Sequence, residues 1–283
     1  MMQLAAEYRA LRATVLRLWM PRIGNAGEAV NDMVRFNETI DQALAESIAT
    51  FSGRAERAKD LFIATLSHDL RAPLASISSA GDMLGHPQLS LEQAVKTGAR
   101  VSRGARLMSS MVDDLADYTR VQLGDGLQLT REHVDLRAIC CAAIDDAKAM
   151  RPDISFNDFL DVDLEGLFDT TRIHRLLTNL LANAAQHGDQ VAPVVLQARP
   201  DGDRLVLTVT NQGAAIPRDK LDAIFEPMVQ LPAGGLGTQP RPGMGLGLYI
   251  ARMVAEAHGG SISVVSEEGK ATSFTVCLPR QGT

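Results

Sequence analysis

Apolar residues recur every three or four positions over the first 120 residues, and this spacing predicts three α-helices. The first helix ends at Pro21, because a proline ring blocks its continuation. The second begins near Glu28 and runs to a turn at residues 85–87. The third keeps a strict three-four alternation, which is typical of a coiled coil or a helical bundle. Its apolar seam consists of Leu91, Ala94, Gly98, Val101, Ala105, Met108, Val112 and Leu115.

Two long helices joined by a short turn cannot bury both of their apolar seams alone. A second copy of the chain can cover them, so the pattern predicts a homodimer that forms a four-helix bundle. The pattern changes after Leu123, where a turn at residues 124–126 precedes a mixture of helical and alternating periods. A boundary between two domains is therefore expected between residues 124 and 133.

The second half of the chain is predicted to be an α+β sandwich. Helices are expected at residues 136–150, 171–186 and 246–258, with a short helical segment at 220–225 and a Gly/Pro-rich loop at 231–243. Strands are expected at residues 191–198, 205–210, 262–266 and 273–278. The turn at residues 200–203 joins the first two strands as a hairpin, and the last two strands close a second hairpin.

Composition narrows the class of protein further. The 283 residues carry 28 Lys and Arg against 34 Asp and Glu, a net charge of -6, which gives no basic surplus for a nucleic-acid partner. The cysteines Cys140, Cys141 and Cys277 form neither a disulfide framework nor a metal-ligand spacing, so a reducing, cytoplasmic location is expected. No apolar run approaches the roughly 18 residues of a membrane helix, and no membrane segment is expected in this chain.

The first candidate site is the segment from Leu66 to Leu74. His68 lies about 200° around the helix from Leu66 and Leu70, so its imidazole is expected to project away from the apolar stripe. An exposed histidine beside the carboxylate of Asp69 can titrate and react. Pro73 removes a helical hydrogen bond one turn later and is expected to bend the helix. Alone, the same pattern is more typical of a polar residue on a solvated helix face than of a reactive group.

The second candidate site lies on the helix predicted for residues 171–186. Steps of four place Asn179, Asn183 and His187 on one face, opposite a leucine-rich face. Their polar groups can hold a hydrated Mg²⁺ and contact phosphates, because this ion takes oxygen ligands and keeps several waters. A solvated polar face remains the alternative for this segment.

The third candidate site is the glycine-rich stretch from Gly243 to Leu248. Glycines let backbone N–H groups approach an anion, and the helix that follows adds partial positive charge at its N-terminus. The dinucleotide-binding fingerprint is a poor match because no strand directly precedes the glycines. A P-loop is excluded because no Gly-Lys-Ser/Thr follows.

In order and spacing, these sites resemble the transmitter core of the sensor histidine kinases of two-component systems. The resemblance covers roughly residues 57–279. The matching motifs are residues 68–73 (H box), 179–183 (N box), 211–217 (G1 box), 225–227 (F box) and 243–248 (G2 box). It implies an N-terminal helical input or linker region at residues 1–54, a dimerisation and histidine-phosphotransfer domain at 55–123, and a Bergerat-type (GHKL) ATP-binding domain at 130–281.

The resemblance also implies roles for individual residues. His68 would attack the γ-phosphate of ATP through Nε2, while Asp69 accepts a hydrogen bond from the other ring nitrogen. Asn183 would bind Mg²⁺ with help from Asn179. The remaining nucleotide-site residues would be His187, Asn211, Gly213, Ile216, Gly243, Gly245, Leu246, Gly247 and Leu248. Residues 231–242 would form a mobile lid, and Phe225 would dock against the helical domain.

Three positions depart from the family pattern. Asn211 and Ala215 stand where an Asp and a Gly are usual. Because Asn211 is uncharged, the hydrogen bond that it accepts from the adenine amino group is weaker, and ATP affinity is expected to fall by about fivefold. Ala72 stands where members that dephosphorylate their partner often carry Asn or Thr. Its methyl group cannot orient a water, so weak phosphatase activity is expected.

The expected partner is the receiver domain of a response regulator, whose aspartate would accept the phosphoryl group. Two other functions stay open. The first alternative is a catalytically silent dimeric module of the same fold, marked by the altered G1 box. The second is an ATPase or Ser/Thr kinase of the same nucleotide-binding fold. Retention of His68, Asp69, Asn179 and Asn183 favours the kinase, because a silent copy has no chemical need for all of them.

Overall fold

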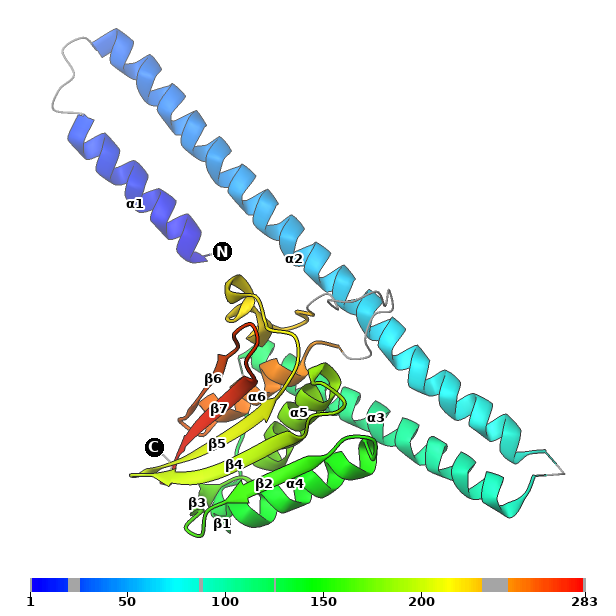
Figure 1. The fold of residues 1–283 in the computed structure, drawn as a ribbon. Helices are drawn as coiled ribbons and strands as arrows, with labels where there is room; N and C mark the ends of the chain where they lie inside the picture. Colours follow the sequence, from blue (N-terminus) through cyan, green and yellow to red (C-terminus); the bar gives the residue numbers. More distant parts are fainter. Residues whose placement is uncertain (1, 20–25, 87–88, 125, 231–243, 282–283) are drawn as a thin grey trace. The chain divides into compact units, whose positions relative to one another are not determined.

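The structure is a computed structural model of the chain, and it describes residues 2–19, 26–86, 89–124, 126–230 and 244–281 (Figure 1). Packing divides the chain into two compact units, Met1–Thr65 and Leu66–Thr283. The first unit contains α1 (Met2–Trp19) and the beginning of α2 (Ala26–Leu84). The hydroxyls of Tyr8 and Ser47 lie 3.2 Å apart, and Arg12 pairs with Asp41, so the two helices run antiparallel.

In the second unit, the C-terminal part of α2 pairs with α3 (Leu91–Leu123) as a helical hairpin. Ser90 begins α3 with a capping box, in which its side chain accepts from the Gln93 N–H and the Gln93 side chain accepts from the Ser90 N–H. Gly124, at φ 88°, ends it. The helices approach closely at Gly104, where a Cβ atom would lie 2.7 Å from Cγ1 of Ile77. Helix α2 continues through Pro73.

The predicted seam of α3 is only partly buried within this single chain. Leu91 and Val112 are 82% and 56% exposed, whereas the buried positions are Thr97, Gly104, Met111 and Asp117. The predicted seam therefore combines two faces of the helix, because small and apolar residues occupy both the face that contacts α2 and a second face that is exposed in this chain. Leu74 and Val95 add to the exposed apolar surface of the hairpin.

The rest of the second unit is a two-layer α/β sandwich. Its elements are β1 (Glu132–Asp135), α4 (Leu136–Met150), β2 (Phe156–Leu160), β3 (Glu165–Phe168), α5 (Thr170–His187), β4 (Val194–Asp201), β5 (Arg204–Asn211), the 3₁₀ turns η2 (Arg218–Lys220) and η3 (Ala223–Phe225), α6 (Gly247–Ala257), β6 (Ser261–Val265) and β7 (Thr272–Pro279). A five-stranded sheet has the order β2-β4-β5-β7-β6, with β2 parallel to β4 and the other neighbours antiparallel. Strands β1 and β3 form a separate antiparallel pair.

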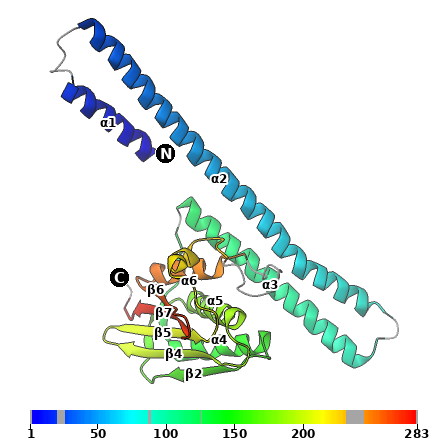
Figure 2. The ribbon, with the colours of Figure 1, turned by 45° about the horizontal axis from the view of Figure 1, so that its top comes forward.

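Helices α4, α5 and α6 cover one face of the five-stranded sheet (Figure 2). Strand β7 shows why, because its residues alternate strictly between buried and half-buried positions. The buried set of Phe274, Val276 and Leu278 belongs to the same apolar core as the leucine-rich face of α5, where Leu176, Leu177 and Leu180 have no exposed surface. This apolar layer fixes α5 and α6 side by side and leaves their polar faces outside the core.

The predicted fold class is confirmed, a helical hairpin followed by an α+β sandwich. The bounds predicted for α4 agree with the structure, and both predicted hairpins of the sandwich are present, as β4–β5 and β6–β7. Strands β1, β2 and β3 were not predicted. They are four or five residues long, and β2 carries the polar residues Asn157 and Asp158, so the hydrophobic pattern does not mark them. The loop expected at 231–243 lies outside the described residues.

Candidate active site

His68 lies on α2 with 65% of its side chain exposed. Its Nδ1 is 3.1 Å from Oδ1 of Asp69, whose side chain is buried with 7% exposed. The other carboxylate oxygen, Oδ2, is also buried and has no hydrogen-bond partner among the described residues. The fixed carboxylate therefore orients the imidazole through Nδ1, and Nε2 is the ring nitrogen that remains available for reaction.

Helix α5 positions the second group of residues. Asp169 caps its first turn, because its side chain accepts from the Arg172 N–H at 3.0 Å. Asn179, Asn183 and His187 follow at intervals of four on a face that adjoins the apolar core. The Nδ2 atom of Asn179 is buried and has no hydrogen-bond partner among the described residues. A buried donor of this kind is costly when unpaired, so it suits a site that receives a polar ligand.

The end of β5 forms the third part. Asn211 is 4% exposed, and its Nδ2 donates to the carbonyl oxygen of Gln212 at 3.2 Å. Gly213 pairs with Gly188, which follows α5, in an isolated β-bridge. A Cβ atom at Gly213 would lie only 2.5 Å from the carbonyl oxygen of His187. The absence of a side chain here lets the end of β5 approach the end of α5 closely.

A chain of hydrogen bonds continues this wall of the site. The N–H of Ile216 donates to Oγ of Ser266 at 2.9 Å, and that hydroxyl lies 2.7 Å from Oγ1 of Thr272. Thr272 is the register partner of Asn211 across β5 and β7. Ser266 and Thr272 were not predicted as site residues, because two isolated hydroxyl residues carry no motif and are brought together only by the sheet.

The glycines before α6 form the fourth part. Gly245 has φ 64°, and a Cβ atom there would lie 3.0 Å from the carbonyl oxygen of Val229. Met228 also has a positive φ of 65°, and its N–H donates to the carbonyl oxygen of Gly245 at 3.0 Å. Gly247 begins α6 beside Asn179, whose Cγ is 3.6 Å from the position of a Cβ atom at Gly247. The two elements that carry the asparagines and the glycines are therefore in contact.

The remaining predicted residues lie in different surroundings. Leu246 is buried in the core and Leu248 is half-buried against it, so both anchor the start of α6 by packing. Gly243 lies outside the described residues. Phe225 was expected to dock against the helical domain, but it is 6% exposed and its ring packs edge-on against Phe274 at 6.2 Å. In this structure its ring is therefore part of the sandwich core, and the docking role stays a prediction.

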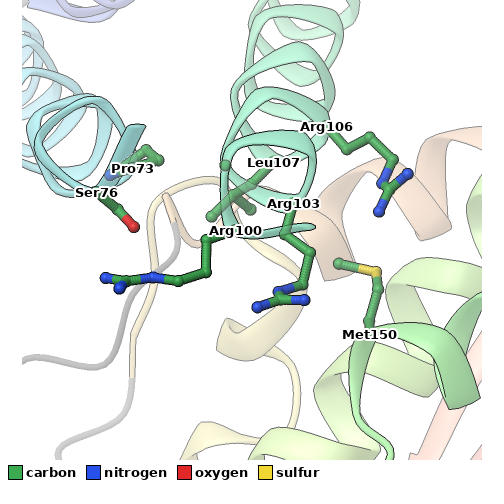
Figure 3. A pocket seen from close by; sticks show the side chains of 8 residues that line it. Pro73, Ser76, Arg100, Arg103, Arg106, Leu107 and Met150 are labelled. Atoms are coloured by element: carbon green, nitrogen blue, oxygen red, sulfur yellow. The ribbon is translucent and has the colours of Figure 1, made fainter. Parts of the chain in front are cut away.

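A pocket of about 340 Å³ lies beside the helical hairpin (Figure 3). It is lined by Pro73, Ser76, Arg100, Arg103, Gly104, Arg106, Leu107 and Met150. Figure 3 shows the three arginine side chains extending from α3. All three are exposed, and within the described residues none of them forms an ion pair with an acidic side chain. The pocket therefore carries positive charge that no acidic side chain of the described residues pairs with.

Comparison with known proteins identifies the two parts of the chain. Residues 58–124 match the family of His Kinase A (phospho-acceptor) domains. Residues 168–282 match the family described as histidine kinase-, DNA gyrase B-, and HSP90-like ATPase. A phospho-acceptor helical domain followed by an ATPase-type domain defines the class of protein. The chain belongs to the sensor histidine kinases of two-component systems.

Individual relatives agree with this family. The chain is 29% identical over 273 residues to a bacteriophytochrome of Pseudomonas aeruginosa, covering 92% of this chain and 37% of that protein. It is 31% identical over 229 residues to the aerobic respiration control sensor protein ArcB of Escherichia coli, covering 80% of this chain and 29% of that protein. The crystal structure of full-length ShkA in complex with AMPPNP matches with a TM-score of 0.54 and 27% identity, over 78% of this chain and 46% of that one. The chain therefore spans less than half the length of each of these three relatives.

Proposed function

We propose that the chain is an ATP-dependent protein-histidine kinase that phosphorylates its own His68. In the reaction, Nε2 of His68 forms a bond to the γ-phosphorus of ATP while the bond from that phosphorus to the bridging oxygen breaks and ADP leaves. The observation that carries the proposal is the 3.1 Å contact from Nδ1 to the buried carboxylate of Asp69. That contact holds the ring and leaves Nε2, the exposed nitrogen, as the nucleophile.

We propose that the nucleotide lies between α5, the end of β5 and the start of α6. The buried side chain of Asn211 would recognise the adenine, with Gly213 and Ile216 beside it. The backbone at Gly245 and Gly247 would approach the phosphates at the N-terminus of α6, and Gly243 would complete this cradle. His187, at the end of α5, would line the same site. The orphaned Nδ2 of Asn179 supports the proposal, because a phosphate oxygen or a coordinated water is the partner that it lacks.

Asn183, helped by Asn179, would hold Mg²⁺ on the same face of α5. Amide oxygens suit this ion, which takes oxygen ligands and keeps several waters. No group of three or more His, Cys, Asp or Glu side chains suited to a metal ion occurs within the described part of the chain. When bound, the ion would neutralise negative charge on the transferred phosphoryl group. The protein contributes the amide groups of Asn179 and Asn183 and holds Asn179 beside the backbone of Gly247.

A homodimer is proposed from the exposed apolar surface of the helical hairpin. Leu74, Leu91, Val95 and Val112 are each more than half exposed, although such residues are normally buried in a two-helix contact. A second copy of the hairpin would cover them and complete a four-helix bundle. Light scattering tests this proposal, and a monomer at micromolar concentration would contradict it.

A response-regulator receiver domain is the proposed acceptor of the phosphoryl group. The aspartate that accepts the phosphoryl group must reach His68. The arginine-lined pocket begins at Pro73, little more than one turn along α2 from His68. Three unpaired guanidinium groups favour an acidic partner surface. Ala72 offers no hydrogen bond to a hydrolytic water, so we propose weak phosphatase activity. Rapid loss of phosphate from the phosphorylated partner in the presence of this protein and ADP would refute that part.

The chain spans 26 to 37% of the length of the curated relatives that it matches. No helix in the described ranges is long and apolar enough to cross a membrane. The three free cysteines are consistent with the reducing interior of a cell, and we propose a cytoplasmic location on that basis.

Autophosphorylation with γ-labelled ATP and Mg²⁺ tests the proposed activity. We expect acid-labile, alkali-stable label in the wild type and none in His68→Ala or Asn183→Ala. Ile63→Ala, which changes an exposed side chain on the same helix, is the matched control and should keep the label. Nucleotide binding without any label would favour the alternative, a silent regulatory module, for which the uncharged Asn211 is the specific mark. Label on Ser or Thr would favour a Ser/Thr kinase of the same nucleotide-binding fold.

A further inference from the structure

Four charged side chains join α3 to α5. Asp117 on α3 accepts hydrogen bonds through Oδ2 from Nη1 of both Arg172 and Arg175. Arg175 also donates through Nη2 to Oδ1 of Asp114 at 2.6 Å. The two aspartates are three residues apart on one helix and the two arginines are three residues apart on the other. Each pair therefore lies on one helix face, and the faces match.

This cluster is largely shielded from water. The side chain of Asp117 is 4% exposed, and those of Asp114, Arg172 and Arg175 are 13%, 16% and 17% exposed. Two positive and two negative groups balance, so the cluster is stable while closed, and removal of one member leaves a desolvated charge without a partner. Burial raises the pKa of Asp114, in keeping with this shielded position. Separation of α3 from α5 would break the contacts of both aspartates, so the cluster distinguishes a closed arrangement of these helices from an open one.

The arginines share a helix face with the proposed metal-binding asparagines. Asn179 lies four residues after Arg175 and seven after Arg172, which places all three within about 60° of one another around α5. A second contact joins α3 to α6, since the rings of Tyr118 and Tyr249 pack edge-on at 5.9 Å. Tyr249 is two residues beyond Gly247, where α6 begins. Helix α3 thus contacts both helices that carry the proposed nucleotide site.

His68 takes no part in these contacts. Its ring pairs with Asp69, and no hydrogen bond or ion pair found within the described residues connects it to the ATP-binding half. Transfer requires the phosphorus atom to come within about 3–3.5 Å of Nε2. A domain held on α3 by the buried cluster keeps its place until the cluster opens.

Resting on the function proposed above, we infer that Asp114, Asp117, Arg172 and Arg175 form a releasable latch. The closed latch holds the ATP-binding half on α3 in a resting position, and its opening precedes phosphoryl transfer to His68. The latch regulates the reaction through the position of α5 and takes no part in the chemistry. It also gives an upstream signal a point of action, because any change in α3 that separates the aspartates from the arginines releases the domain.

The kinetic test removes the two negative charges of the latch and keeps the size of the side chains. In the full chain carrying Asp114→Asn and Asp117→Asn, we expect the autophosphorylation rate at saturating Mg-ATP to rise by about fivefold or more, the lower end of the usual coupling between sites. The dissociation constant for ATP should change less than twofold. Asp163→Asn is the matched control, because it removes an exposed partner of Arg280 far from α3 in the sequence and should leave the rate unchanged.

A distance measurement tests the latch without any catalysis. Spin labels at Thr119→Cys on α3 and Val191→Cys before β4, both exposed positions, report on the separation of the two parts in a Cys141→Ser background. We expect a narrow distance distribution in the otherwise unmodified chain and a broad one in the double Asn variant. The complete charge swap, Asp114→Arg and Asp117→Arg together with Arg172→Asp and Arg175→Asp, restores two positive and two negative groups and should narrow the distribution again.

The outcomes separate the latch from the kinase activity. A broad distribution in the double Asn variant supports the latch even when no label transfer occurs in any protein, and in that case only the proposed function fails. An unchanged narrow distribution would overturn the latch. A fall in the autophosphorylation rate with unaltered ATP binding would also overturn it, because the cluster would then hold the domain in a productive position.

Discussion

Gly213 provides the sharpest steric test of the nucleotide site. A methyl group in Gly213→Ala would lie 2.5 Å from the carbonyl oxygen of His187, 3.3 Å from Cα of Gly188 and 3.4 Å from Nδ2 of Asn211. The first two obstacles are backbone atoms, which cannot rotate away. The end of β5 must therefore separate from the end of α5, and the bridge between Gly188 and Gly213 opens.

The magnitude follows from two terms. Overpacking of this kind costs about 1–3 kcal/mol, and the loss of the hydrogen bond from the Asp189 N–H to the Gln212 carbonyl adds about 1 kcal/mol. A destabilisation of about 2–4 kcal/mol lowers the melting temperature of a unit of this size by roughly 4–16 °C. Asn211 moves with the strand end, so ATP affinity should fall by about fivefold or more, equivalent to one hydrogen bond.

Calorimetric melting and titration with ATP measure both effects. Gly81→Ala is the matched control, because a Cβ atom there meets nothing within 4 Å and alanine favours the helix. It should melt no lower than the wild type and bind ATP equally. If Gly213→Ala melts within about 1 °C of the wild type and binds ATP normally, then the close approach of α5 and β5 is not what shapes the site.

Three further predictions rest on single groups. Burial lowers the pKa of His258, whose Nε2 accepts a hydrogen bond from the Asp169 N–H, so the folded state binds fewer protons than the unfolded state. The melting temperature should therefore fall as the pH decreases below the ordinary histidine pKa of 6.5. A melting temperature that stays constant from pH 8 to 5.5, in the wild type and in His258→Gln alike, would count against this. Asn211→Asp should raise ATP affinity by about fivefold in calorimetric titration, since a charged acceptor strengthens the bond to the adenine amino group, and unchanged affinity would remove Asn211 from the adenine site. Burial raises the pKa of Cys140 to about 12, so iodoacetamide should label the exposed Cys141 first in mass spectrometry, and equal labelling of Cys140 would contradict its burial.

The sequence predicted those parts of the fold that have a local periodic signal. The helix at residues 136–150 and the two hairpins follow from apolar spacing and from turn residues, and the structure agrees with them. The heptads of α3 predicted the helix correctly, but they did not separate its two faces, one against α2 and one, with Val112, that is exposed in the single chain. Periodicity identifies a face only when one side of a helix is polar, and α3 carries small residues on both.

The candidate site divides in the same way. The histidine, asparagine and glycine boxes are contiguous motifs, so their residues could be named from the sequence, although the close approach of Gly213 to His187 required the structure. The latch could not be predicted, because Asp117 and Arg172 are 55 residues apart and each is an ordinary charged residue on a helix. The packing of Phe225 could not be predicted for a related reason, since only the fold reveals that its ring contacts Phe274.

The position of the phosphoryl group on the imidazole shows directly which ring nitrogen of His68 reacts with ATP. Asp69 engages Nδ1 of His68, so phosphorylation should occur on Nε2. After reaction with Mg-ATP, ³¹P and ¹⁵N NMR of the alkali-denatured protein distinguish the two phosphohistidine isomers. We expect the Nε2-phosphorylated isomer at His68 in the wild type and no phosphohistidine in His68→Ala. The Nδ1 isomer, or phosphate on any other residue, would contradict it.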